Sequence, residues 1–267
     1  MTNVLEDILR TKREEIALLR DTPCVATRDA VAPRGTRVVS TLLRSRGEPL
    51  RLLTEIKRRS PSAGPLSTAL SVSERALKYA RAGASMISVL CDTPFFAGGW
   101  HHVSEARAAL DAAGLGVFVL AKEFVLDERQ VEEAAARGAD AILLIVRILD
   151  PEKLARLVER ARACGLEPLV EVVTEDELSA AVDADAKVIG VNARDLDTLV
   201  MDPARAARVL AAIPADRVSV HLSGLKGPAD VAAVARTNAD AALMGEALMR
   251  QDDPEPLLRS MLAAASG

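Results

Sequence analysis

Eight short apolar runs alternate with longer helical patterns along this chain, and this alternation constrains its possible folds more than any other feature. The runs are rich in Val, Ile and Leu and occupy residues 52–57, 85–91, 116–121, 141–146, 168–173, 187–192, 217–222 and 241–244. Strands that are apolar on both faces are typical of a parallel sheet covered by helices on both sides. Eight such strand–helix units close into a barrel, and a length of 267 residues suits one barrel. We therefore predict an α/β protein with a (β/α)₈ TIM-barrel fold.

An open, doubly wound sheet is the alternative architecture. It would need a Gly-rich turn after the first strand to hold a nucleotide, and the sequence has none there. Residues 4–20 precede the first strand and have the apolar spacing of an extra amphipathic helix. We expect one domain over residues 1–267, in which residues 1–48 form an N-terminal helical extension and residues 49–267 form the barrel.

Composition and charge exclude several classes of protein. The net charge is −4, from 34 basic and 38 acidic residues, which argues against a general nucleic-acid binder. The three cysteines are far apart and the three histidines are few, so neither a disulfide framework nor a metal site is expected. No apolar run reaches the roughly 18 residues of a membrane span. A reduced, metal-free, cytoplasmic protein with no membrane or nucleic-acid partner is the expectation.

Charged and amide side chains interrupt the apolar strands near their C-terminal ends, where barrel active sites form. They belong to the first, third, fifth and sixth strands and are Glu55, Lys57, Lys122, Glu171, Asn192 and Arg194. A buried charge costs free energy unless it is paired or functional. A structural ring of ion pairs would explain Glu55 and Lys57 equally well, since they share one face of a strand. The recurrence on several strands favours an active site, and Glu171 is the most telling because it has no partner nearby in sequence.

Small residues follow the last two strands, at the place where barrels commonly bind phosphate. Ser223 and Gly224 end the seventh strand, and Gly245 ends the eighth. Glycine lets the backbone approach a ligand closely, although each glycine alone would be explained by a tight turn. The pair predicts a small phosphorylated molecule as the binding partner. The segment RRSPSAGPL after the first strand is either a mobile lid or a plain loop.

Several motifs together resemble the indole-3-glycerol phosphate synthase family of tryptophan biosynthesis. The matching segments are LEDILRTKREEI, TEIKRRSPSAG, ISVLCDTPFFAGG, AKEFVLDERQVEEAAARGADAILLIV, GLEPLVEVVTEDEL, VIGVNARDLDTLVMD, LSGLKGPADV and LMGEALMRQDDP. The resemblance covers nearly the whole chain. It implies a carboxy-lyase that converts 1-(2-carboxyphenylamino)-1-deoxyribulose 5-phosphate to indole-3-glycerol phosphate by ring closure, decarboxylation and dehydration. It also implies no cofactor, no metal, and a monomer or weak homodimer.

The resemblance assigns roles to the residues at the strand ends. Lys122 would be the general acid that protonates the ketone, and a lysine near other cations should have a lowered pKa. Glu171 would handle protons on the aniline side and in dehydration, while Glu55 and Asn192 would orient the substrate and assist dehydration. The expected catalytic set is Lys122, Glu171, Glu55, Asn192, Lys57 and Ser223.

The resemblance also implies three kinds of substrate contact, which are contacts to anionic groups, to the phosphate and to the aromatic ring. Lys57 and Arg194 would hold anionic groups. The phosphate region would comprise Ser60, Gly224, Gly245 and the backbone of Glu246. The apolar pocket around the ring would comprise Pro61, Phe96, Phe124 and Leu196, and Leu222 and Leu243 complete the expected substrate-binding set.

The sequence departs from the family pattern at three positions. Leu222 stands where the family normally has Glu, directly before Ser223 and Gly224. Glu123 stands where Asp follows the lysine, and Ala121 stands where Arg is frequent. Loss of a charged hydrogen bond worth about 1.5–3 kcal/mol predicts catalysis weaker by about ten- to a hundredfold.

The change at Leu222 leaves three interpretations. The chain is an active synthase with altered rates, a diverged paralogue acting on a related anthranilate-derived phosphate in a specialised pathway, or a non-catalytic barrel partner. Retention of the whole charged set disfavours the third. A phosphate-sugar isomerase barrel is the next enzyme class, but it commonly needs a Cys or Asp near the first strand, where this chain has Glu55 and Lys57.

Overall fold

The computed structural model describes residues 4–18, 38, 41–45, 47–61 and 63–266. Helix α1 (Val4–Leu18) confirms the predicted N-terminal helix, whose last two expected residues lie outside the described ranges. Most of the remaining predicted extension, residues 19–37, also lies outside them. In the described part of the chain, every helix is too short or too polar to span a bilayer.

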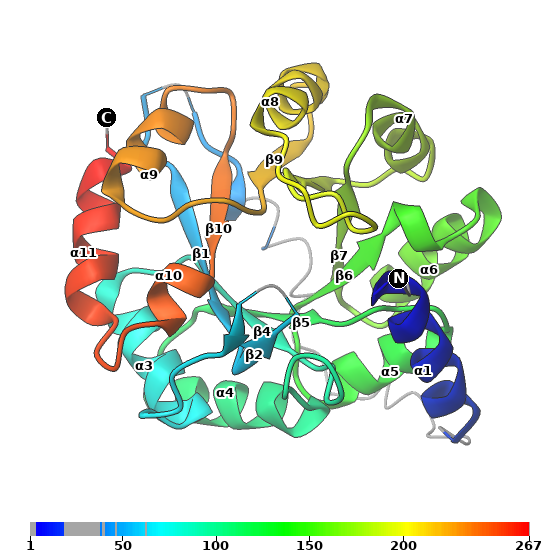
Figure 1. Ribbon diagram of the computed structural model, residues 1–267, viewed down its shortest axis with the longest axis horizontal. Coiled ribbons are helices and arrows are strands. Elements are labelled where there is room, and N and C mark those ends of the chain that lie inside the picture. The colour runs from blue at the N-terminus through cyan, green and yellow to red at the C-terminus, as the bar shows by residue number, and fades with distance from the viewer. Residues whose placement is uncertain (1–3, 19–37, 39–40, 46, 62, 267) are drawn as a thin grey trace.

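Eight parallel strands close into a barrel, which confirms the predicted fold (Figure 1). Going around it, the order is β1, β10, β9, β8, β7, β6, β5, β4 and back to β1. Each strand coincides with one predicted apolar run. The strands are β1 (Arg51–Ile56), β4 (Met86–Leu90), β5 (Phe118–Lys122), β6 (Ala141–Ile145), β7 (Glu167–Val172), β8 (Val188–Val191), β9 (Val218–His221) and β10 (Ala241–Met244).

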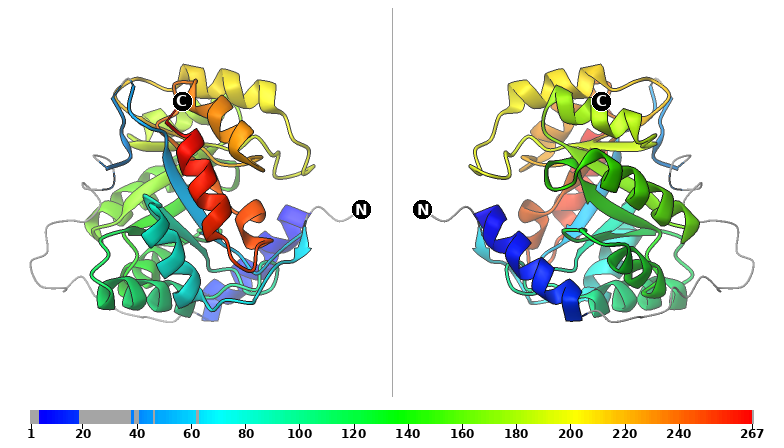
Figure 2. Two further views of the ribbon diagram at one scale, coloured as in Figure 1. Left: turned by 90° about the vertical axis from the view of Figure 1, so that its left-hand side faces the viewer. Right: turned by 90° about the vertical axis from the view of Figure 1, so that its right-hand side faces the viewer.

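Helices follow the strands and form the outer layer of the barrel (Figures 1 and 2). Several of them begin at side-chain caps. For example, Asp127 accepts from the backbone N–H of Arg129, and Thr174 accepts from that of Glu177. The helices are α3 (Val72–Ala82), α4 (Trp100–Ala112), α5 (Glu128–Ala136), α6 (Pro151–Ala163), α7 (Glu175–Asp183), α8 (Pro203–Ala212), α9 (Pro228–Ala235), α10 (Glu246–Met249) and α11 (Glu255–Ala264). A short 3₁₀ turn, η1 (Val146–Ile148), follows β6.

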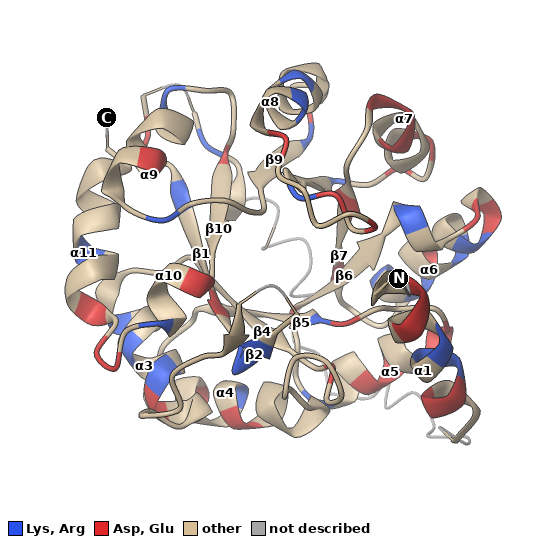
Figure 3. Cartoon of the chain, viewed as in Figure 1, with Lys and Arg blue, Asp and Glu red and all other residues tan. Residues whose placement is uncertain are grey.

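The loop after β1 folds back on itself as a small antiparallel hairpin of β2 (Arg59–Ser60) and β3 (Gly64–Pro65). This hairpin, α1 and α10 gather at one end of the barrel (Figure 2). On outer helices such as α1, α3 and α6, acidic and basic residues are interspersed, in keeping with the small net charge (Figure 3).

Alternation along each strand separates two apolar clusters. Leu52 and Val119 belong to the larger cluster between strands and helices, whereas Leu53 and Leu120 belong to the cluster inside the barrel. Successive strand residues point to opposite faces, so the residue two positions after an interior one also points inward. This period places Glu55 above Leu53 and Lys122 above Leu120, at the C-terminal mouth. The repeat that builds the core therefore also aims the polar side chains into one space.

Candidate active site

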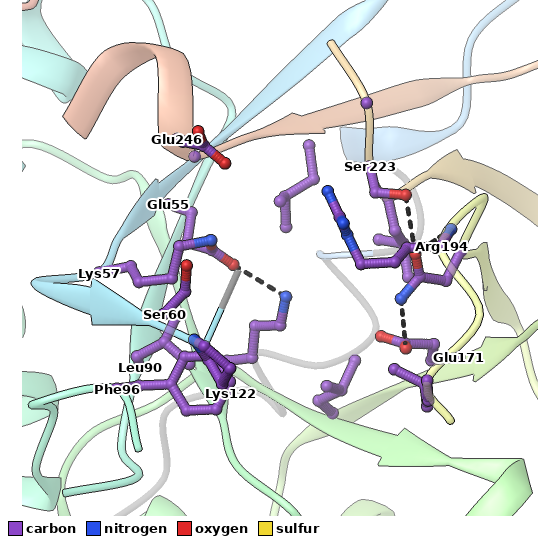
Figure 4. A pocket seen from close by; sticks show the side chains of 18 of the residues that line it. Glu55, Lys57, Ser60, Leu90, Phe96, Lys122, Glu171, Arg194, Ser223 and Glu246 are labelled. Carbon is purple, nitrogen blue, oxygen red and sulfur yellow. Dashed lines mark hydrogen bonds and ion pairs between the residues drawn. The ribbon is translucent and has the colours of Figure 1, made fainter. Parts of the chain in front are cut away.

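A cavity of about 480 Å³ opens at the C-terminal ends of the strands. Its lining comes from α1, α10, β1, β6, β7, the β2–β3 hairpin and the loops after β4, β5, β8, β9 and β10. Every residue of the predicted catalytic and substrate-binding sets lines it. Side chains that are far apart in sequence thus converge around one space, as the close-up view shows (Figure 4).

Glu55 is held between two ammonium groups. Its Oε1 lies 2.6 Å from Lys57 Nζ, and its Oε2 accepts from Lys122 Nζ at 2.8 Å (Figure 4). Burial raises the pKa of this carboxyl, but Lys122 and Lys57 outweigh burial and bring the pKa down to about 2. Glu55 is therefore a fixed anion at neutral pH, and it compensates both lysines at once.

Lys122 is an ammonium with a raised pKa, so the expectation of a lowered pKa is wrong. Burial lowers the pKa, but the charges of Glu55 and Glu171 raise it by more. The expectation assumed that cations would be the nearest charges, whereas the fold places carboxylates there. Lys122 enters a reaction protonated, which is the state that a general acid requires.

Glu171 heads a chain of hydrogen bonds on the opposite wall. Asn192 Nδ2 donates to Glu171 Oε1 at 2.8 Å, and Ser223 Oγ donates to Asn192 Oδ1 at 2.7 Å (Figure 4). The backbone N–H of Arg194 also donates to Asn192 Oδ1, at 2.9 Å. These two donors fix the orientation of the Asn192 amide, so that its NH₂ group faces Glu171.

The two buried carboxylates have opposite pKa shifts. Burial raises the pKa of Glu171, and Lys122 and Asn192 only partly oppose that effect. The pKa of Glu55 is lowered instead, because two lysines contact it directly. Pairs of carboxyl groups whose pKa values are driven apart can divide acid and base roles.

Close packing explains the glycines at the ends of the last two strands. A Cβ on Gly245 would lie 3.0 Å from Glu55 Cβ and Cδ, and closer still to Oε1. Gly224 has a φ of 94°, in the left-handed region that disfavours other residues. Both positions therefore need glycine for the geometry of the cavity wall itself.

Apolar side chains line the rest of the cavity. The rings of Phe96 and Phe124 have centroids 6.0 Å apart and are tilted by 37°. Leu222 is only 4% exposed, and its side chain occupies the space above Gly190, where a Cβ would meet Leu222 Cδ1 at 2.5 Å. The position at the end of β9 is thus part of an apolar floor, and the carboxylate in direct contact with both lysines is Glu55.

Comparison with known proteins identifies the family. The model of the indole-3-glycerol phosphate synthase family matches residues 5–261. The chain belongs to this family. It is 41% identical to an indole-3-glycerol phosphate synthase of Kineococcus radiotolerans, over 98% of this chain and 96% of that protein. It is 44% identical to indole-3-glycerol phosphate synthase 1 of Streptomyces coelicolor, over 82% and 80% respectively. The resemblance stated from the motifs is confirmed.

Solved structures share the barrel at much lower identity. The 3-hexulose-6-phosphate synthase of Salmonella typhimurium superposes with a TM-score of 0.64 at 15% identity, covering 81% of this chain and 98% of that one. Another 3-hexulose-6-phosphate synthase has a TM-score of 0.62 at 21% identity, with coverages of 80% and 99%. At such identity the likeness supports the fold alone.

Sequence reasoning missed the part that α1 plays in this indole-3-glycerol phosphate synthase barrel. Val4, Leu5 and Ile8 line the cavity. Lys12 lies on the same buried face of the helix as Ile8 and Ile16. The available signal was a lysine at a position where the helical period calls for an apolar residue. Within the described residues, no three His, Cys, Asp or Glu side chains are placed to hold a metal ion.

Proposed function

We propose that this member of the family catalyses the indole-3-glycerol phosphate synthase reaction, with Lys122 as the general acid. The observation that carries the proposal is the placement of the Lys122 ammonium between Glu55 and Glu171, whose carboxyl pKa values are shifted in opposite directions. The substrate is the phosphorylated carboxyphenylamino-deoxyribulose. Its aromatic ring would lie against the apolar wall that includes Phe96 and Phe124.

Ring closure joins the carboxyl-bearing ring carbon to the substrate's carbonyl carbon. As this bond forms, the carbonyl π electrons move onto oxygen, and Lys122 donates a proton there to give a hydroxyl group. The ring nitrogen becomes an iminium. Loss of carbon dioxide then returns the electrons of the broken carbon–carbon bond to that iminium. Glu55 keeps Lys122 charged and aimed before the step.

Dehydration removes the new hydroxyl group and a proton from the neighbouring carbon. We assign Glu171 to this proton transfer, because burial raises its pKa and makes it a stronger base than an exposed carboxylate. Asn192 and Ser223 hold Glu171 in orientation through their chain of hydrogen bonds. Glu171 takes the proton from the carbon and passes it to the departing hydroxyl group, which leaves as water. Lys122 regains from solvent the proton that it gave in ring closure, so each turnover consumes one proton.

Substrate binding is assigned to the remaining lining. We assign Lys57 and Arg194 to the anionic groups. The walls formed by Ser60, Gly224, Gly245 and Glu246 are assigned to the phosphate. The proposal also includes one domain over residues 1–267 that acts in the cytoplasm as a monomer or weak homodimer.

The test is the fluorescence of indole-3-glycerol phosphate formed from the purified substrate. We expect the wild-type chain to turn over and Lys122→Ala to lose about 10²–10⁴-fold in kcat, the range for removal of a general acid. Lys187→Ala is the control, since Lys187 precedes β8 at the other end of the barrel and pairs with Asp185. A folded wild-type chain that forms no product would refute the assignment.

Leu222 favours a second candidate function. The apolar floor at the end of β9 offers no hydrogen bond to a polar substrate group. A related anthranilate-derived phosphate with an altered ring would suit this floor. Product formation from ring-substituted substrates at higher kcat/KM than from the parent compound would support this alternative.

A further inference from the structure

A buried ion cluster fastens helix α1 to the barrel beside the cavity. Lys12 is 1% exposed, and its Nζ lies 2.8 Å from Asp92 Oδ2 and 3.2 Å from Glu123 Oε2. Its third partner, Glu15, lies on α1 itself at 2.7 Å. Burial lowers the pKa of Lys12, but Glu123 and Asp92 raise it by more, so that it stays charged. One cation thus joins a helix to two loops that follow β4 and β5.

Each of the two loop carboxylates uses its second oxygen to order the backbone of an aromatic residue. Asp92 Oδ1 accepts from the N–H groups of Phe95 and Phe96, at 2.7 and 3.0 Å. Glu123 Oε1 accepts from the N–H of Phe124 at 2.8 Å. In each loop, a single carboxylate therefore connects the Lys12 ammonium group to the backbone of a residue that lines the cavity.

The two aromatic residues at the ends of these links are neighbours on the cavity wall. Phe96 and Phe124 have the ring-centroid distance of 6.0 Å given above. The β2–β3 hairpin is tied to the same loop, since the N–H of Arg59 donates to Phe96 O at 3.1 Å and its guanidinium donates to Phe95 O at 3.2 Å. The spacing of the aromatic pair thus depends on how closely Asp92 and Glu123 are held.

Lys12 is the cation that holds Asp92 and Glu123 close together. Asp92 is 0% exposed and Glu123 is 3% exposed, so two carboxylates share a buried space. Removing one partner of a buried charge cluster leaves the others uncompensated and is strongly unfavourable. Burial already raises the pKa of Glu123 to about 7, even though Lys12 opposes this effect. Without Lys12, the two loops would separate or admit water between them.

We propose that Lys12 is a positioning residue for the ring-binding wall, and that it sets the spacing of Phe96 and Phe124 through Asp92 and Glu123. This inference rests on the proposed function, because it assigns that wall to the substrate's aromatic ring. Lys12 touches no reacting atom in this scheme. Its effect belongs to substrate binding, and therefore to KM more than to kcat.

The experiment compares Lys12→Met, Lys12→Arg and the control Arg10→Met in steady-state kinetics. Arg10 lies on the same helix, but its side chain is 65% exposed and pairs with Asp7 and Glu14 on the surface. For Lys12→Met we expect KM to rise about tenfold or more while kcat falls by less than about threefold. Lys12→Arg keeps the cation and should restore KM to within about threefold of wild type. Arg10→Met should match wild type.

A second readout follows the loop after β4 without substrate. Trp100 is the single tryptophan of the chain, and it begins α4 directly after Gly98 and Gly99 of that loop. Acrylamide quenching of Trp100 fluorescence should increase in Lys12→Met and stay unchanged in Arg10→Met. A role limited to anchoring α1 would lower the thermal midpoint but leave both KM and the quenching unchanged, and that result would overturn the proposal.

The remaining outcomes separate the two proposals. If Lys12→Met does not fold, Lys12→Gln takes its place, since its amide still donates to one carboxylate while the charge is lost, and the same changes are expected. If wild type forms no product, the proposed function fails, and the quenching comparison still decides whether Lys12 holds the loop. If wild type is active and folded Lys12→Met keeps its KM, only the positioning role is refuted.

Discussion

Leu222 is an apolar side chain at a cavity position where the family pattern has a carboxylate. It lies at the end of β9, 4% exposed, directly before Ser223 of the hydrogen-bonded chain on Glu171. Leu222 carries no charge, and the carboxylate in direct contact with both Lys57 and Lys122 is Glu55. Lys122 and Lys57 outweigh the effect of burial and bring the pKa of Glu55 down to about 2, so Glu55 is ionised at neutral pH.

Leu222→Glu should raise kcat/KM by about tenfold. A carboxylate at this position could accept a hydrogen bond from a substrate hydroxyl or pair with a lysine, and a charged hydrogen bond is worth about 1.5–3 kcal/mol. The measurement is steady-state synthase kinetics with the parent substrate.

Leu222→Gln is the matched control, since it has nearly the same shape without the charge and should show no such gain. Urea unfolding should find Leu222→Glu less stable than wild type, because a carboxylate replaces a buried apolar group. A folded Leu222→Glu that loses activity would mean that the apolar floor serves this chain's own substrate.

At the scale of elements, the barrel mouth depends on close approach between neighbouring strands. β10 pairs with β1, and the residue after β10 is Gly245, whose backbone lies against the Glu55 side chain. The strand register thereby places the backbone of Gly245 next to Glu55, the carboxylate that contacts both lysines. This arrangement explains a glycine at that site without any appeal to turn geometry.

Gly245→Ala should lower kcat by about tenfold or more, because the added methyl group would push Glu55 away from Lys57 and Lys122. Its φ of −127° is accessible to alanine, so the effect is steric. Gly116→Ala is the control, since nothing lies within 4 Å of a Cβ there. Kinetics and circular dichroism of the two variants give the comparison, and equal kcat values would exclude a role for Glu55 in aiming Lys122.

At the scale of the whole molecule, the barrel has buried acids at both ends. Glu171 is near the C-terminal end of β7, and Glu167 begins the same strand at the opposite end, 5% exposed. Burial raises the pKa of Glu167 from 4.5 to about 7, although Arg162 and Lys187 oppose it. Its Oε1 is a buried oxygen without a hydrogen-bond partner among the described residues. Substitution of Glu167 therefore tests how a buried carboxyl group remote from the cavity affects stability at different pH values.

Glu167→Gln should be more stable than wild type above pH 7 and nearly equal to it below pH 5. The folded chain binds the Glu167 proton more tightly than the unfolded chain does. The stability that protonated Glu167 contributes is therefore complete below pH 4.5 and is lost as pH rises through about 7. Allowing for partial solvent contact, the gain should be about 1–2 kcal/mol. Urea unfolding at pH 5 and pH 8 measures it, with the exposed Glu159→Gln as control. Equal stability differences at both pH values would contradict the raised pKa.

Local patterns in the sequence determined the barrel fold and which residues line its cavity. Each strand is a short run whose alternation of inward and outward residues is a property of consecutive positions. Once eight such runs close, inward positions at their C-terminal ends, including Glu55, Lys122 and Glu171, must face one space. The motifs around them pointed to the family, and the comparisons confirmed it.

The tertiary structure alone decided how the charges pair. Lys12 and Glu123 are 111 positions apart, and Lys122 and Glu55 are 67 apart, so no local period relates them. The direction of the pKa shift of Lys122 depends on which charges the fold brings nearest, and that is why the expectation of a lowered pKa was wrong. Hydrophobic period is a property of neighbours in the chain, whereas electrostatic energy depends on distances and burial that exist only once the chain has folded.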